Sequence, residues 1–269
     1  MATFFVRVCR FSRLAVIWIA FSVASGASAQ SIDSGDQHSP ALTFLYEKPA
    51  STELQEVFES LRDSRILESW TGYANRRLKP LPHQIEAAFA ECGKASSLYE
   101  PKRQRITLCY EEADRSFKML NLLGYESIDQ LLTSWIGTML FEFYHELGHA
   151  LVDMLSLPVL GKEEDAADDF AVIVLLGHPG GWELTLGSAD YFEAMAKVET
   201  ELGLNPAHRH PFFSQRHFNT LCLTYGSDPR KHSVLVTQGR LPEVRAESCR
   251  LEYEQAVYGW SAVLNPGIK

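Results

Sequence analysis

The sequence predicts an α+β fold in which a small antiparallel sheet lies beside one long buried helix and the C-terminal part is mainly helical. Apolar residues alternate with other residues at positions 85–89 and again at 105–110, which is typical of half-buried strands. Across residues 131–154, apolar residues recur every three or four positions, as they do on the packed face of a helix. Further helical patterns follow as far as residue 264.

The first 29 residues have the pattern of a cleavable secretory signal peptide. The pattern consists of a basic start, an apolar run and small residues at the cleavage site: Arg7, Arg10 and Arg13, residues 14–23, and Ala27-Ser28-Ala29. The alternative is an uncleaved anchor, but the apolar run is shorter than the roughly 20 residues that span a bilayer. We therefore expect a periplasmic or secreted protein with no stable membrane insertion.

The predicted mature chain is acidic. Residues 1–29 carry three arginines and no acids, so their removal changes the formal net charge from −9 to −12. This charge disfavours binding to nucleic acid or to an anionic membrane, and it attracts basic substrates at long range. Residues 30–40 are polar and are expected to form a flexible leader. Length and apolar content predict a single domain over residues 41–269, with a helical lobe from about residue 189.

The first elements of this domain are expected to support the long helix. Residues 42–46 are strand-like. A helix is expected from about Glu53, where Thr52 and Gln55 have the spacing of a capping pair. The two alternating segments then form the predicted antiparallel sheet.

A pair of histidines lies inside the long helix. Ser127 and Gln130 have the spacing of a capping box just before the apolar stripe, which predicts where the helix begins. His145 and His149 are four residues apart, so their imidazoles lie on the same face and can share one metal ion. Glu146 lies beside that face, where it can reach a metal-bound water without being a ligand.

This H-E-x-x-H pattern predicts a zinc site that performs hydrolysis. Zinc with three protein ligands keeps one position open for water and lowers the pKa of that water to about 7. A neighbouring carboxylate, here Glu146, takes the proton as the water attacks a carbonyl. The alternative is a core helix without metal, which would have to bury two imidazoles and a carboxylate with hydrogen bonds alone.

An acidic segment after the long helix offers the third ligand. Leu157 and Pro158 end the first helix and Gly161 supplies a turn, so a second helix can double back beside it. In this second helix, Glu164 is expected to bind the metal, and Asp168, one turn later, to hold a ligand histidine in the correct tautomer. The alternative without metal is a solvated acidic helix start. Two neighbouring carboxylates stay open as alternative ligands: Glu163 and Asp165.

These motifs resemble those of the gluzincin metallopeptidases. His145-Glu146-x-x-His149 followed by Glu164-x-x-Ala167-Asp168 is similar to the gluzincin pattern, in which the first glutamate of the second motif is the third zinc ligand. Over most of the mature chain the sequence resembles, more closely, a bacterial secreted family of unknown function described as metallopeptidases. The shared segments include Glu91-Cys92-Gly93, Ser97-Leu98-Tyr99, Cys109-Tyr110-Glu111, Gln215-Arg216 and Tyr225-Gly226-Ser227-Asp228-Pro229.

The resemblance implies a zincin-like fold, zinc as the cofactor, and a peptide or protein as the substrate. In zincin-like enzymes an extended peptide pairs with an edge strand of the sheet, and this backbone pairing depends little on side-chain identity. The alternative for such an edge is that it is covered or solvated.

Four cysteines are left once Cys9 is removed with the signal peptide. An even number of cysteines in an oxidising compartment predicts two disulfides. Three pairings are possible, and local pairing is the simplest: Cys92 with Cys109 and Cys222 with Cys249. The absence of a C-x-x-C pair in the chain argues against a cysteine zinc site.

Three C-terminal helices are expected near residues 190–202, 212–225 and 242–264, where they would close one side of the cleft. His210 lies just ahead of the second of them and is the candidate donor to a developing oxyanion. The family resemblance places a histidine at this position, six residues before Arg216. A role as a surface loop residue is the alternative, and the rival donors are Tyr99, Tyr144 and Tyr225.

The sequence therefore predicts a secreted zinc metallopeptidase with Glu146 as the general base. Two other functions stay open: a zinc-stabilised binding or inhibitory module without turnover, and a hydrolase of a non-peptide amide or ester. The intact Glu146 favours an enzyme, because a structural zinc site needs neither a base nor an open coordination position.

Overall fold

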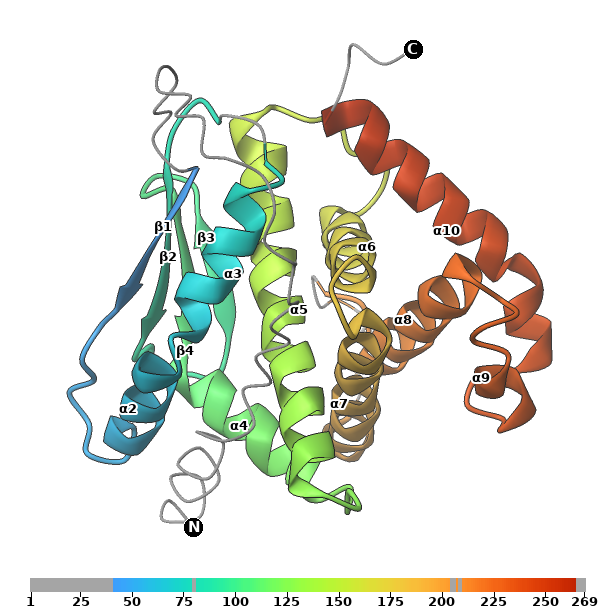
Figure 1. The fold of residues 1–269 in the computed structure, drawn as a ribbon, viewed down its shortest axis with the longest axis horizontal. Coiled ribbons are helices and arrows are strands. Elements are labelled where there is room, and N and C mark those ends of the chain that lie inside the picture. The colour runs from blue at the N-terminus through green and yellow to red at the C-terminus, as the bar shows by residue number, and fades with distance from the viewer. Residues whose placement is uncertain (1–40, 79–80, 204–206, 208–209, 265–269) are drawn as a thin grey trace, which may run out of the picture.

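A long central helix separates a four-stranded sheet from a layer of helices (Figure 1). The computed structural model describes residues 41–78, 81–203, 207 and 210–264, so the predicted signal peptide (1–29) and leader (30–40) lie outside the described residues. The strands are β1 (Leu42–Tyr46), β2 (Ile85–Ala90), β3 (Ser97–Glu100) and β4 (Arg105–Cys109). The helices are α2 (Gln55–Ser64), α3 (Ile66–Asn75), α4 (Tyr110–Asn121), α5 (Ile128–Met154), α6 (Glu163–Leu176), α7 (Gly181–Leu202), α8 (Phe213–Ser227), α9 (Val234–Thr237) and α10 (Glu243–Leu264).

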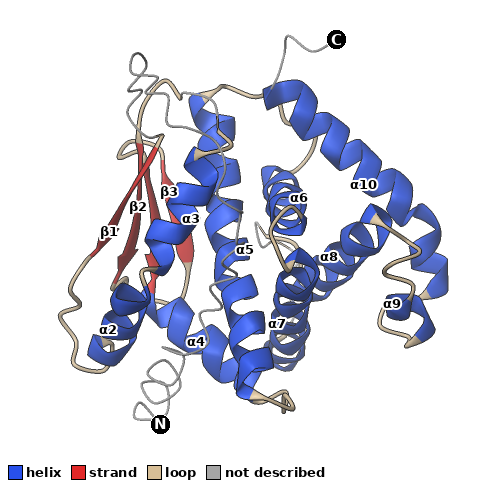
Figure 2. Ribbon diagram, viewed as in Figure 1, coloured by secondary structure: helices blue, strands red, loops and turns tan. Residues whose placement is uncertain are grey.

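The protein is of mixed α+β class and mostly helical, as the sequence predicts (Figure 2). None of the helices in the described part of the chain is both long and apolar enough to cross a membrane.

The sheet is mixed, and the prediction of an antiparallel sheet was wrong for its central strands. The strand order is β1-β2-β4-β3, with β1 parallel to β2 and β2 parallel to β4. Only β3 is antiparallel, to β4, and it forms one edge of the sheet. Alternating residues identify a strand but not its direction. Parallel pairing requires a crossover between the strands, and residues 91–104, which contain β3, supply it.

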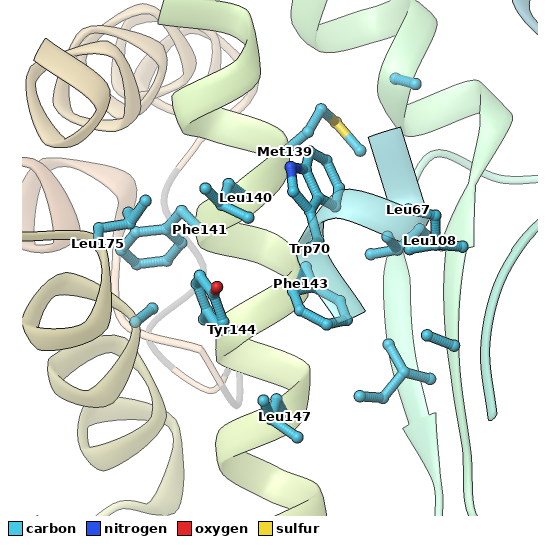
Figure 3. Close-up of a cluster of buried hydrophobic side chains, with 14 of the residues drawn as sticks. Leu67, Trp70, Leu108, Met139, Leu140, Phe141, Phe143, Tyr144, Leu147 and Leu175 are labelled. Carbon is cyan, nitrogen blue, oxygen red and sulfur yellow. The ribbon is translucent and has the colours of Figure 1, made fainter. Parts of the chain in front are cut away.

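The core is centred on α5, which is the best predicted element. Ser127 accepts a hydrogen bond from the backbone N–H of Gln130 (3.2 Å), so the predicted cap is present. On one side, Phe143 packs against Trp70 of α3, with ring centroids 5.9 Å apart (Figure 3). Burying a large apolar side chain of this kind contributes roughly 1.5–3 kcal/mol.

Glycines bring α5 and α7 into close contact. A Cβ built on Gly137 of α5 would lie 2.1 Å from the carbonyl oxygen of Leu184, and one built on Gly187 of α7 would lie 2.3 Å from Cα of Ser134. The backbones themselves are therefore the packing surfaces at this crossing, and it fixes α7 beside the helix that carries the histidines.

We predict that Gly187→Ala lowers the free energy of unfolding by about 1–3 kcal/mol, because the new methyl group overlaps the backbone of α5. Urea unfolding followed by circular dichroism measures this change. The matched control is Gly259→Ala in α10, where an added Cβ meets no atom within 4 Å. That variant is expected to be neutral or more stable by up to about 1 kcal/mol. Equal stability of Gly187→Ala and the parent protein would contradict the close packing.

Both predicted disulfides are present in the structure. Cys92, which follows β2, is joined to Cys109 at the end of β4, and Cys222 of α8 is joined to Cys249 of α10. The cysteines of the two bonds are 17 and 27 residues apart in sequence. For loops of this length, a disulfide stabilises the folded protein by about 3 kcal/mol, because it lowers the entropy of the unfolded chain. The second bond fixes the outermost helix to the helix that carries Arg216.

Candidate metal site

The candidate site lies where α5 and α6 pack closely together. A Cβ built on Gly148 of α5 would lie 3.2 Å from Cα of Ala167 in α6, so only small residues fit at this contact. His145 and His149 flank Gly148 in sequence, and Glu164 and Asp168 flank Ala167. The close approach of the two helices therefore brings the two histidines and the two carboxylates together.

Three buried donor atoms converge at this contact. His145 Nε2 lies 3.2 Å from His149 Nε2 and 3.3 Å from Glu164 Oε2, and His149 Nε2 lies 3.5 Å from Glu164 Oε2. Donor atoms bound at about 2.0–2.1 Å to a tetrahedral zinc ion lie about 3.3–3.4 Å from one another. The spacing and the chemistry of these donors therefore fit one zinc ion.

The other ring nitrogen of each histidine faces a carboxylate of α6. His145 Nδ1 lies 2.7 Å from Asp168 Oδ1, and His149 Nδ1 lies 2.6 Å from Glu163 Oε1. A hydrogen bond from Nδ1–H to a carboxylate leaves Nε2 unprotonated and available to a metal. Glu163, an alternative ligand by sequence, thus contacts the outer side of a histidine. Asp165, the other alternative, is exposed and lines a separate surface pocket.

Arg216 of α8 holds Asp168 in place, and the sequence did not assign it a role in the site. Its guanidinium donates to both oxygens of Asp168, at 2.9 Å from Nε and 2.8 Å from Nη2, and lies over the ring of Phe192. Burial opposes ionisation of Asp168, but Arg216 and His145 lower its pKa to about 2. Burial likewise disfavours the charged imidazole, yet the hydrogen bond with Asp168 raises the pKa of His145 to about 10.

Glu146 is buried beside the two histidines. Burial raises the pKa of its carboxyl group, and the nearby His145 and His149 oppose that rise. The backbone of Tyr99 in edge strand β3 also opposes the rise in the pKa of Glu146. A carboxylate with a raised pKa is a better proton acceptor than an exposed one, because its pKa lies closer to the working pH.

Of the four candidate oxyanion donors, the structure brings His210 to the converging atoms. His210 Nδ1 lies 2.8 Å from Glu164 Oε2, and its side chain is 43% exposed. The hydroxyl of Tyr144 instead pairs with His178, and that of Tyr99 donates to Asp153. Tyr225 packs against a separate cluster between α8 and α10.

His210 also competes with His149 as a candidate metal ligand. His145, Glu164 and His210 form a group whose donor atoms all lie within 4.8 Å of one another. We favour His149, because its ring is buried and fixed by Glu163, and its Nε2 completes the tetrahedral spacing. His210 lies on the exposed side of the same site.

Comparison with known proteins agrees with a metal-dependent activity. Residues 46–264 match the sequence profile of a family described as DUF4344, "putative metallopeptidase". Neither the curated proteins nor the solved structures gave a match. The family description implies a bound metal and peptide-bond hydrolysis, and the converging histidines and carboxylate provide a place for that metal. The chain belongs to this metallopeptidase family.

Proposed function

We propose that the protein is a secreted zinc metallopeptidase of gluzincin type, with a zincin-like fold. The observation that carries the proposal is the tetrahedral spacing of three donor atoms with a buried glutamate beside them. In this proposal His145, His149 and Glu164 bind zinc, Glu146 is the general base, and Asp168 orients His145.

Each residue of the proposed site has a separate role in the reaction. Zinc bound there would act as a Lewis acid and lower the pKa of a water molecule to about 7. Glu146 accepts the proton from the attacking water and passes it to the amine that leaves. His210 donates a hydrogen bond to the oxyanion that develops on the substrate carbonyl. Asp168 and Glu163 keep both histidine rings in the tautomer that leaves Nε2 free.

Edge strand β3 is the proposed binding surface for the substrate backbone. It pairs with β4 along one side only, and it packs against α5. An extended peptide added to the other side of β3 would form main-chain hydrogen bonds next to Glu146. The antiparallel edge strand, the histidine helix and the second acidic helix together support the assignment of a zincin-like fold.

The structure also supports the proposed location and domain organisation. Two disulfides favour an oxidising compartment, as expected for a secreted or periplasmic protein. The larger of two apolar clusters in the described residues contains side chains from β1 (Leu42) to α10 (Trp260), which favours a single domain over residues 41–269.

Profiling with an unbiased peptide library tests the proposed function. The purified mature protein is incubated with the library, and mass spectrometry identifies the products. We expect cleavage that stops when a chelator removes the metal and returns when Zn²⁺ is added. Cleavage that persists in the chelated protein, or a zinc-loaded protein that cleaves no peptide, would contradict the proposal.

We predict that Asp168→Asn weakens zinc binding by about 10–100-fold, because the amide no longer holds the correct tautomer of His145. Competition with a chromophoric chelator measures the affinity, and circular dichroism shows that the protein is folded. Asp165→Asn on the same helix is the matched control, because Asp165 is exposed and is expected to leave affinity unchanged. An unchanged zinc affinity in Asp168→Asn would refute the positioning role of this residue.

A further inference from the structure

A pocket of about 470 Å³ opens directly beside the candidate metal site. It shares His210 and Arg216 with that site, and α5 contributes Glu142 to its lining. Glu142 precedes His145 by three residues and Glu146 by four, so the three side chains lie on neighbouring positions of one helix face. Ser97, the first residue of edge strand β3, also lines the pocket.

The charges that line this pocket leave an excess of negative charge. Three carboxylates face two guanidinium groups, and the two cations are already engaged. Arg115 forms an ion pair with Glu112, and Arg216 makes two hydrogen bonds with Asp168, which lies outside the pocket.

Glu142 is the lining carboxylate to which the described residues donate no hydrogen bond, whereas Glu112 pairs with Arg115 and Glu199 accepts from the backbone N–H of Phe213. Among the residues that the structure describes, Arg216 is the one cation within 4 Å of it, at 3.9 Å from Nη2 to Oε1. This separation is too long for a hydrogen bond. The Glu142 side chain is only 13% exposed, so water has limited access to it. A buried carboxylate in this situation is stabilised by a ligand that brings a positive charge.

The remaining walls suit a long aliphatic chain. Met195, Val198, Leu202 and Phe213 line the pocket from α7 and the start of α8. Lysine and arginine place their methylene groups along apolar surfaces while the charged end reaches a polar partner. An acidic side chain would meet like charge, and an apolar one would bury Glu142 without a partner.

We propose that this pocket is the subsite that selects a lysine or arginine side chain of the peptide substrate, and that Glu142 determines this specificity. The inference rests on the proposed peptidase function. A peptide that extends along β3 passes Ser97 and can direct one side chain into the pocket while its scissile bond lies next to Glu146. The net charge of −12 on the predicted mature chain attracts the same basic peptides at long range.

Cleavage of an unbiased peptide library by the zinc-loaded protein tests this inference, followed by kcat/KM for matched peptides. The peptides differ only by lysine or norleucine at the selected position. We expect lysine or arginine to be enriched at one position next to the cleaved bond. Glu142→Gln should lower kcat/KM for the lysine peptide by about 10–100-fold, the range for loss of a charged hydrogen bond. The norleucine peptide should be cleaved at an unchanged or higher rate.

The control is Glu193→Gln, which removes one negative charge from an exposed position of α7 outside the pocket. Glu193→Gln should keep the preference for lysine. Because it removes the same charge as Glu142→Gln but at a position outside the pocket, the comparison separates recognition in the pocket from long-range attraction. Zinc content and thermal unfolding verify that both variants are folded and loaded.

The possible outcomes separate the two proposals. Cleavage without enrichment of basic residues would overturn the subsite while leaving the peptidase function intact. This outcome can be observed with the parent protein alone, so it does not depend on the folding of a variant. A lysine preference that survives in Glu142→Gln would overturn the role of that residue. Absence of all cleavage would overturn the peptidase function and the subsite with it.

Discussion

Glu146→Gln is expected to retain one zinc ion per protein and to lower kcat/KM for peptide cleavage by about 10²–10⁴-fold, the usual contribution of a general base. Glutamine has nearly the same shape as glutamate but does not accept the proton of the attacking water. Because Glu146 is proposed to be a base and not a ligand, its replacement leaves the three metal-binding donors in place. Metal analysis and steady-state kinetics on one preparation measure both quantities.

Asp129→Asn is the matched control for this experiment. Asp129 is an exposed carboxylate in the first turn of the same helix, distant in sequence from the histidines. The Asp129→Asn variant should retain both its zinc ion and its peptidase activity. Equal activity of Glu146→Gln and the parent protein would rule out the mechanism, and loss of zinc from Glu146→Gln would show that this residue is a ligand.

Glu164→Gln is expected to be purified without stoichiometric zinc, because it replaces the only anionic donor among the three proposed ligands. Glu163→Gln provides the neighbouring comparison on the same turn of α6. Its carboxylate contacts Nδ1 of His149 and not the converging donor atoms. Glu163→Gln should therefore weaken zinc binding by no more than about 10–100-fold.

These two variants distinguish adjacent carboxylates that the sequence left as alternatives. Isothermal titration of the metal-free proteins with Zn²⁺ gives both affinities. If Glu163→Gln loses zinc while Glu164→Gln retains it, the ligand assignment is wrong. Circular dichroism ensures that a loss of affinity does not reflect unfolding.

Features of the site that depend on local spacing were predictable from the sequence. Residues four apart on a helix share a face, so the pairing of His145 with His149 and of Glu164 with Asp168 follows from their positions. The cap at Ser127 and both local disulfides are short-range features of the same kind.

Features that depend on long-range contacts were not predictable in the same way. Arg216 lies far from Asp168 in sequence, and only the packing of α8 against α6 brings the two together. Glu142 becomes part of a pocket because α4, α7 and α8 pack around this part of α5. The direction of β4 relative to β2 likewise depends on the path of the connection and not on the alternation of either strand.

Helix boundaries were predicted less well than helix existence. α4 follows β4 without a break, so the strand pattern that ends at Tyr110 concealed the start of a helix. α7 begins at Gly181 and not near Asp190, because the left-handed Gly180 starts the helix directly after the turn. At α2, Thr52 accepts from the backbone of Gln55 through its carbonyl oxygen and provides no side-chain cap.

Crystals of the zinc-loaded protein, measured at the zinc absorption edge, provide the most direct test of the proposed metal site. An anomalous difference map should show one peak at about 2.0–2.2 Å from His145 Nε2, His149 Nε2 and a carboxylate oxygen of Glu164. A peak bound by His210 in place of His149, a peak bound by Glu163 in place of Glu164, or no peak between α5 and α6 would contradict the assignment.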